Sequence, residues 1–108
     1  MTGVQTCALP ICVQIDAVAE LETLAVRTRN NTYEITVISP ATGEVLVRGG
    51  LFFPDHTRVR LAGSSLGGSF LRCRGIYLGF RMELQHEGET IVTTEVRSIE
   101  RTSDRVVQ

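Results

Sequence analysis

The sequence has no lysine and no tryptophan, and its eleven basic residues are all arginine. It lacks any run of about 18 apolar residues, which excludes a membrane-spanning helix. The formal net charge of −1 argues against general, phosphate-driven binding of nucleic acid, although a local basic patch stays compatible with it. With 43% hydrophobic and 21% charged residues, the 108-residue chain is not disordered, and its length fits one domain.

Cysteine is scarce, and two of the three cysteines fall in an unusual N-terminal segment. Residues 1–11, MTGVQTCALPI, carry no charge and no helical or strand period. They resemble the conceptual translation of a common sequencing adapter, with GTG read as the initiator Met and Cys12 as the junction codon. The resemblance implies that residues 1–12 are a non-native scar, disordered or loosely attached, and it leaves the natural N-terminus upstream of Val13 undefined. Cys73 is then the one secure cysteine, which predicts no intrachain disulfide and favours the cytoplasm.

In the remaining chain, closely spaced turn-forming residues predict a single all-β domain over residues 13–100, followed by a polar tail over 101–108. Asn30-Asn31 is a hairpin candidate, because Asn tolerates the positive φ of a primed turn. Residues 76–84 have the clearest period of two, with Phe80 on the apolar face. Asp16 either caps a short helix over residues 17–24 or lies in an extended edge. The expected strands are 24–28, 33–38, 44–48, 57–62, 76–84 and 90–99.

These strands and turns predict a small curled barrel or sandwich of five to six short antiparallel strands, SH3-like or OB-like, with one short N-terminal helix as an option. The stretch from Val13 to the C-terminus is similar to small bacterial β domains, and this general likeness involves no diagnostic motif. The expected core consists of apolar residues on the inward strand faces: Val26, Tyr33, Ile35, Val37, Leu46, Val59, Leu61, Leu78, Phe80, Met82, Val92 and Val96.

Residues 63–67, Gly-Ser-Ser-Leu-Gly, match the G-x-S-x-G pattern of a nucleophile elbow. That chemistry requires the Ser on a strained turn between a strand and a helix. Here a β-type sequence follows Ser65, and the later His86 and Asp104 stand in the wrong order for a hydrolase triad. A small serine hydrolase using Ser65 is therefore kept only as an alternative, and we expect no enzyme and no catalytic residue.

The same glycine-rich segment has a second interpretation as an anion nest, in which consecutive backbone N–H groups surround a phosphate or carboxylate. Arginines flank it on both sides, and alternation places Arg72 and Arg74 on one face with Cys73 opposite. The plain alternative is a bulged connection with solvated arginines. The candidate ligand-binding residues are Arg58, Arg60, Gly63, Ser64, Ser65, Gly67, Gly68, Arg72 and Arg74.

No metal-ligand spacing is present, so the sequence predicts neither a metal site nor a cofactor. In Phe52-Phe53 we expect at least one buried ring, and an exposed ring beside arginines is able to stack a nucleobase. Together these features predict a non-catalytic binding or regulatory module that contacts a protein or an anionic ligand through glycine-rich loops and an arginine-bearing face. Binding of single-stranded nucleic acid is the alternative.

Overall fold

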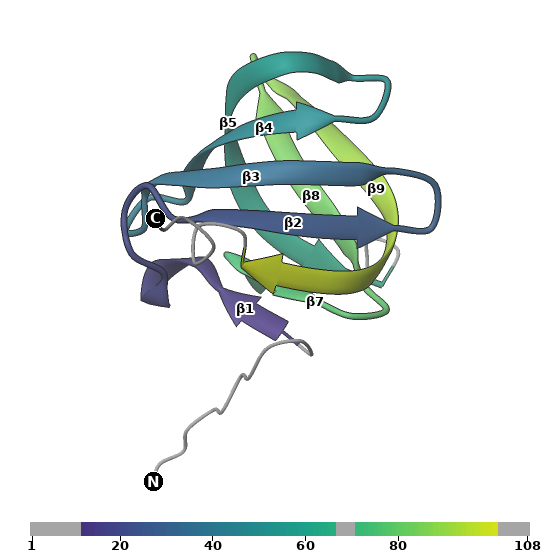
Figure 1. Cartoon of the computed structure of the whole chain (residues 1–108), viewed down its shortest axis with the longest axis horizontal. Coiled ribbons are helices and arrows are strands. Elements are labelled where there is room, and N and C mark those ends of the chain that lie inside the picture. The colour runs from purple at the N-terminus through teal and green to yellow at the C-terminus, as the bar shows by residue number, and fades with distance from the viewer. Residues whose placement is uncertain (1–11, 67–70, 102–108) are drawn as a thin grey trace, which may run out of the picture.

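The computed structural model describes residues 12–66 and 71–101, with only the backbone described for residues 71–73. Almost all of this chain is β-strand, as Figure 1 shows. The elements in chain order are β1 (Cys12–Gln14), a 3-10 turn η1 (Ile15–Ala17), β2 (Thr23–Thr28), β3 (Thr32–Ser39), β4 (Glu44–Gly49), β5 (Phe53–Ser65), β6 (Leu71–Cys73), β7 (Gly75–Tyr77), β8 (Arg81–His86) and β9 (Glu89–Arg101).

Six of the strands close into a ring. Strands β2, β3, β4, β5, β8 and β9 pair antiparallel in that order, and β9 returns to pair with β2 (Figure 1). Strand β6 adds to β5, and β1 pairs with β7 in a separate two-stranded sheet. This architecture confirms the expected all-β fold of short antiparallel strands. Within the described ranges no helix is long and apolar enough to cross a membrane.

The core fills the inside of the ring, where alternate residues of each strand point inward. Eight expected core residues are buried: Val26, Tyr33, Ile35, Val37, Val59, Leu61, Met82 and Val96. Leu46 was assigned to the wrong face, because Val45 and Val47 on either side of it are the buried residues of β4. Val92 is also outside the core, at 47% exposure.

The segment 76–84 is not one strand, which corrects the prediction made from its alternation. Strand β7 ends at Tyr77, and β8 begins at Arg81. Between them Gly79 has φ +84°, and the Phe80 N–H donates to the Tyr77 carbonyl at 3.1 Å. Leu78 and Phe80 therefore lie in a turn. Phe80 is only partly buried and packs against the Tyr77 ring at a centroid distance of 5.5 Å.

Strand β9 departs from strict alternation at two bulges. Its buried side chains are Thr93, Val96 and Ile99, each three residues from the next. One register shift occurs in the pairing with β8 and the other in the pairing with β2. Because each bulge adds one residue, the inward face moves along by one position at each of them. Val92 points outward for this reason.

The N-terminal part of the domain contains no α-helix, so the option of a helix over residues 17–24 is wrong. A single 3-10 turn forms at residues 15–17, and Leu21 adopts φ +67° before β2 begins. Cys12 belongs to β1 and is disulfide-bonded, with a partner outside the described side chains. The expectation of no disulfide is therefore wrong. A cytoplasmic location stays a prediction, and the cysteine count no longer supports it. Residues 1–11 and 102–108 lie outside the described residues.

Candidate anion-binding site

The glycine- and serine-containing segment predicted as a loop is strand where it is described. Gly63, Ser64 and Ser65 are the last residues of β5, where they pair with β6 on one side and β8 on the other. The hydroxyl of Ser64 donates to the Gly75 carbonyl at 2.6 Å. The loop expectation is wrong for these three residues, because a strand paired on both sides does not present its N–H groups as a nest. Gly67 and Gly68 lie outside the described residues.

Ser65 does not occupy a strand-to-helix turn. Its side chain is 1% exposed, and its hydroxyl donates to Glu83 Oε2 at 2.6 Å. The two histidines have other neighbours: His56 Nε2 lies 3.4 Å from Glu34 Oε1, and the His86 ring packs edge-on against Phe53. The local structure therefore lacks the turn that the elbow pattern requires.

Arg58 and Arg60 lie on the outer face of β5, as their spacing of two predicts. Arg58 Nη2 donates to Glu44 Oε1 at 3.3 Å. Arg60 donates twice, to the Thr42 carbonyl and to Gln85 Oε1, each at 3.1 Å. A groove of about 310 Å³ runs beside them, but Glu44 and Glu87 also line it. These arginines are thus largely satisfied within the fold, and the carboxylates in the groove oppose an anion.

The alternation argument for the two later arginines fails at Arg74. Arg72 pairs through its backbone with Ser64, and its side chain is not described. Arg74 has φ +53° in the turn between β6 and β7, so strand alternation ends before it, and a shared face with Arg72 stays a prediction. Arg74 Nη2 lies 3.9 Å from Asp16 Oδ2. Its carbonyl accepts the Ile15 N–H at 2.8 Å, which joins the N-terminal segment to the rest of the fold.

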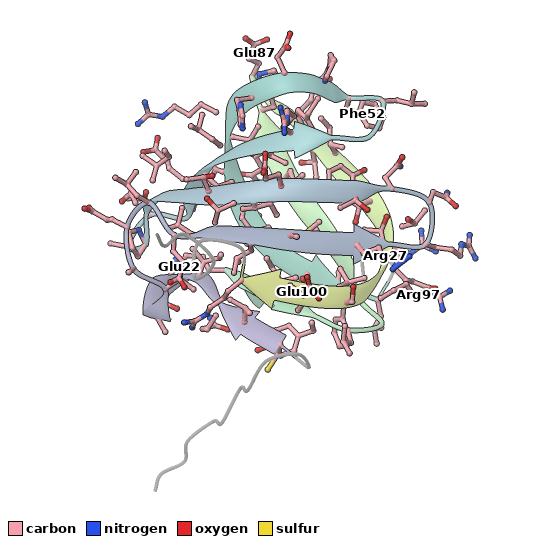
Figure 2. The ribbon with its side chains drawn as sticks, viewed as in Figure 1. Glu22, Arg27, Phe52, Glu87, Arg97 and Glu100 are labelled. Atoms are coloured by element: carbon pink, nitrogen blue, oxygen red, sulfur yellow. The ribbon has the colours of Figure 1, made fainter. Side chains whose placement is uncertain are left out.

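A different arginine cluster, missed from the sequence, lines an open pocket of about 440 Å³. Its lining residues are Arg27, Thr28, Arg29, Arg97 and Ser98, and we call it the arginine pocket. It lies where β2 ends beside β9, at the edge where Figure 2 labels Arg27 and Arg97. All three arginine side chains in it are exposed, whereas Thr28 is buried.

The second bulge of β9 builds one wall of the arginine pocket. Arg27 pairs with Ser98 and Thr28 pairs with Val96, so Arg97 has no opposite residue on β2. Because Val96 and Ile99 both point inward, the two residues between them project on the outer side. The bulge thus brings Arg97 beside Arg27. The spacing of three between Val96 and Ile99 is the sequence signal for this geometry.

The turn after β2 builds the opposite wall. The Thr28 hydroxyl accepts the Asn31 N–H and donates to the Asn31 carbonyl, both at 3.1 Å. The Arg29 N–H donates to the Glu95 carbonyl at 3.0 Å, which fixes the turn against β9. Neither Asn30 nor Asn31 has a positive φ, so the expected primed turn is wrong. The bonds to Thr28 support the turn instead.

The arginine pocket carries an excess of positive charge. Within residues 12–66 and 71–101, Arg27 and Arg29 form no ion pair with a carboxylate. Arg97 Nη2 lies 3.7 Å from Glu95 Oε1, which is too long for a good hydrogen bond, and both side chains are exposed. Of the three arginines that line the pocket, only Arg97 has an ion-pair partner among the described residues, and that contact is weak.

No family model, no curated protein and no solved structure matches this chain. In the part of the chain that the structure describes, no group of three or more His, Cys, Asp or Glu is placed to hold a metal ion. The arginine pocket is therefore the feature from which a function is inferred below.

Proposed function

We propose that this protein is a non-catalytic binding module that holds an anionic group of a partner molecule in its arginine pocket. The proposal rests on a difference between two pairs of arginines. Arg27 and Arg29 are exposed and form no ion pair among the described residues. Arg58 and Arg60 instead donate hydrogen bonds to groups of their own fold. The proposal keeps the expected function and moves its site from β5 to the junction of β2 and β9.

The chemistry of guanidinium groups supports an oxyanion as the ligand. Each guanidinium presents five N–H donors in a planar fork that matches phosphate or carboxylate oxygens. Charge-assisted hydrogen bonds of this kind contribute about 1.5–3 kcal/mol each. Ser98 also lines the pocket, and a serine hydroxyl is a further possible donor to an oxyanion. Because the pocket is an open surface depression, it suits an anionic group attached to a larger partner.

The test is a calorimetric titration of inorganic tripolyphosphate into the protein at about 50 mM salt, where screening is weak. The variant is Arg27→Gln with Arg29→Gln. The matched control is Arg58→Gln with Arg60→Gln, which removes the same charge at the same spacing. We expect at least tenfold weaker binding in the first variant, or about 1.4 kcal/mol, and an affinity close to that of the unmodified protein in the control.

Thermal unfolding of both variants shows that each is folded before the comparison is made. Equal losses of affinity in the two variants would show that only net charge matters and would remove the arginine pocket as the site. Absence of saturable binding to the unmodified protein would remove the proposed function itself.

A further inference from the structure

The hairpin between β4 and β5 presents an exposed aromatic ring. Leu51 is 92% exposed and Phe52 is 63% exposed, whereas Phe53 is 1% exposed and belongs to the core. This arrangement confirms that one of the two neighbouring phenylalanines is buried, and it leaves the other on the surface. Gly50 has φ +66°, and a Cβ there would come within 2.8 Å of Tyr33 Oη. The hairpin is thus packed closely on Tyr33 at Gly50, and the Phe52 ring lies 6.4 Å from the buried Phe53 ring between centroids.

The exposed ring and the arginine pocket lie at the same end of the ring of strands. Gly49, at the end of β4, pairs with Tyr33 on β3, and Tyr33 pairs with Val26 on β2. Neighbouring strands are about 4.8 Å apart, so the hairpin is roughly 10 Å from β2. Figure 2 shows Phe52 and Arg27 labelled toward the same side of the molecule.

Near the hairpin, an arginine of β4 is ion-paired with a carboxylate of β3. Arg48 Nη2 lies 3.0 Å from Glu34 Oε1, and His56 Nε2 lies 3.4 Å from the same oxygen. The Glu34 carboxylate is therefore already engaged by basic side chains of its own fold. The same side of the molecule therefore carries an exposed aromatic ring and, about two strand spacings away, the arginine pocket.

We infer that the anionic partner is single-stranded nucleic acid, with a base stacked on Phe52 and phosphates held by the arginine pocket. The inference rests on the proposed function and names the partner. A single strand offers two features that this surface suits: flat bases, which stack on aromatic rings, and a repeating phosphate charge. The net charge of −1 does not oppose this, because binding depends on the local arrangement of charge.

A protein partner fits this surface less well. A stable protein interface buries about 800 Å² on each side, with a core rich in apolar and aromatic residues. Here the exposed apolar part of the hairpin is confined to Leu51 and Phe52. One exposed ring on the same side of the molecule as the arginine pocket suits a base and its phosphates better than an apolar segment of a protein.

The experiment measures fluorescence anisotropy of a labelled oligodeoxythymidylate of about eight nucleotides at about 50 mM salt. We expect Phe52→Ala to weaken its binding at least about fivefold, which is the lower end of base–aromatic stacking. The same variant leaves the affinity for tripolyphosphate unchanged. Phe52→Tyr keeps the affinity for the oligonucleotide, and Val92→Ala is the control for loss of an exposed apolar side chain.

A spectroscopic arm reports stacking directly. The protein has no tryptophan, so Phe52→Trp introduces a single indole at the hairpin. We expect its fluorescence to be quenched by the oligonucleotide and to be unchanged by tripolyphosphate.

The outcomes separate the partner from the proposed function. If Phe52→Ala binds the oligonucleotide as tightly as the unmodified protein while tripolyphosphate binding depends on Arg27 and Arg29, the nucleic-acid inference fails and the anion-binding function stands. If tripolyphosphate does not bind at all, the proposed function fails. A poly-glutamate peptide that binds more tightly than the oligonucleotide, with the same dependence on Phe52, overturns the inference in favour of a protein partner.

Discussion

Two pairs of arginines on this molecule have the same spacing and different surroundings. Arg58 and Arg60 project from β5 toward Glu44, Gln85 and the β3–β4 turn, and they donate hydrogen bonds to all three. Arg27 and Arg29 stand where β2 ends, beside Ser98 and a third arginine of β9. The comparison teaches that the residues opposite a strand decide whether its arginines are available to a ligand, and spacing alone does not.

The largest expected effect concerns the strand that creates this difference. Ile99 is buried and anchors β9 beyond the bulge that exposes Arg97. Ile99→Ala should lower the free energy of unfolding by about 2–5 kcal/mol, measured by urea denaturation. Val92→Ala, at an exposed position of the same strand, should cost less than about 1 kcal/mol. Equal costs would mean that the inward face of β9 is wrongly assigned.

The next effect concerns the turn that positions Arg29. Thr28→Val removes the hydroxyl that bonds both polar backbone groups of Asn31. Loss of these bonds at a buried residue should lower the free energy of unfolding by about 1–3 kcal/mol. It should also weaken tripolyphosphate binding, because the turn no longer holds Arg29 against β9. Thr28→Ser should recover most of both losses, and a Ser variant no better than Val would show that the hydroxyl is not what supports the turn.

A smaller effect concerns the stability of the fold, in which Arg58 and Arg60 should matter more than Arg27 and Arg29. Arg58→Gln with Arg60→Gln should lower the free energy of unfolding by about 1 kcal/mol, because exposed ion pairs and hydrogen bonds contribute little individually. Arg27→Gln with Arg29→Gln should change it by less than about 0.5 kcal/mol. Chemical denaturation of the two variants measures the difference. A larger loss in the second pair would show that those arginines stabilise the fold.

The smallest effect is a pH dependence of the stability of the fold, which arises from Tyr33 on β3. Burial raises the pKa of Tyr33 above its ordinary 10.0, and the side-chain hydrogen bond with Asn31 acts in the opposite direction. The folded state therefore holds this proton more tightly than the unfolded state. The resulting stability is complete below the unfolded pKa of 10.0 and is lost as the pH rises from there through the folded pKa.

Unfolding midpoints from about pH 9 to pH 11 should therefore fall more steeply in the unmodified protein than in Tyr33→Phe. Because the two proteins differ only at Tyr33, the difference between the curves reports this residue. Parallel curves would show that Tyr33 titrates alike in the folded and unfolded states.

The sequence predicted local features well and features that depend on pairing poorly. The alternation of Tyr33, Ile35 and Val37 correctly identified a buried face, because all three residues lie on one uninterrupted strand. The apparent strand over 76–84 failed because one positive φ at Gly79 outweighed a regular apolar pattern.

The candidate site was misplaced because its position depends on how the strands pair. Arg97 meets Arg27 only because the ring closes by pairing β9 with β2 and because that pairing contains a bulge. The spacing of Val96 and Ile99 indicates the bulge, but the pairing of β9 with β2 cannot be read from residues near Arg97 in the sequence. The predicted serine segment lost its candidate role because β6 and β8 pair with it on both sides.

The most direct test of the central claim observes each arginine separately. The Nε–Hε groups of arginine give individual signals in ¹⁵N-correlated nuclear magnetic resonance spectra, which are followed while tripolyphosphate is added. We expect the signals of Arg27, Arg29 and Arg97 to shift together and to saturate, while those of Arg58 and Arg60 stay in place. Saturating shifts at Arg58 and Arg60, with Arg27 and Arg29 unmoved, would contradict the account.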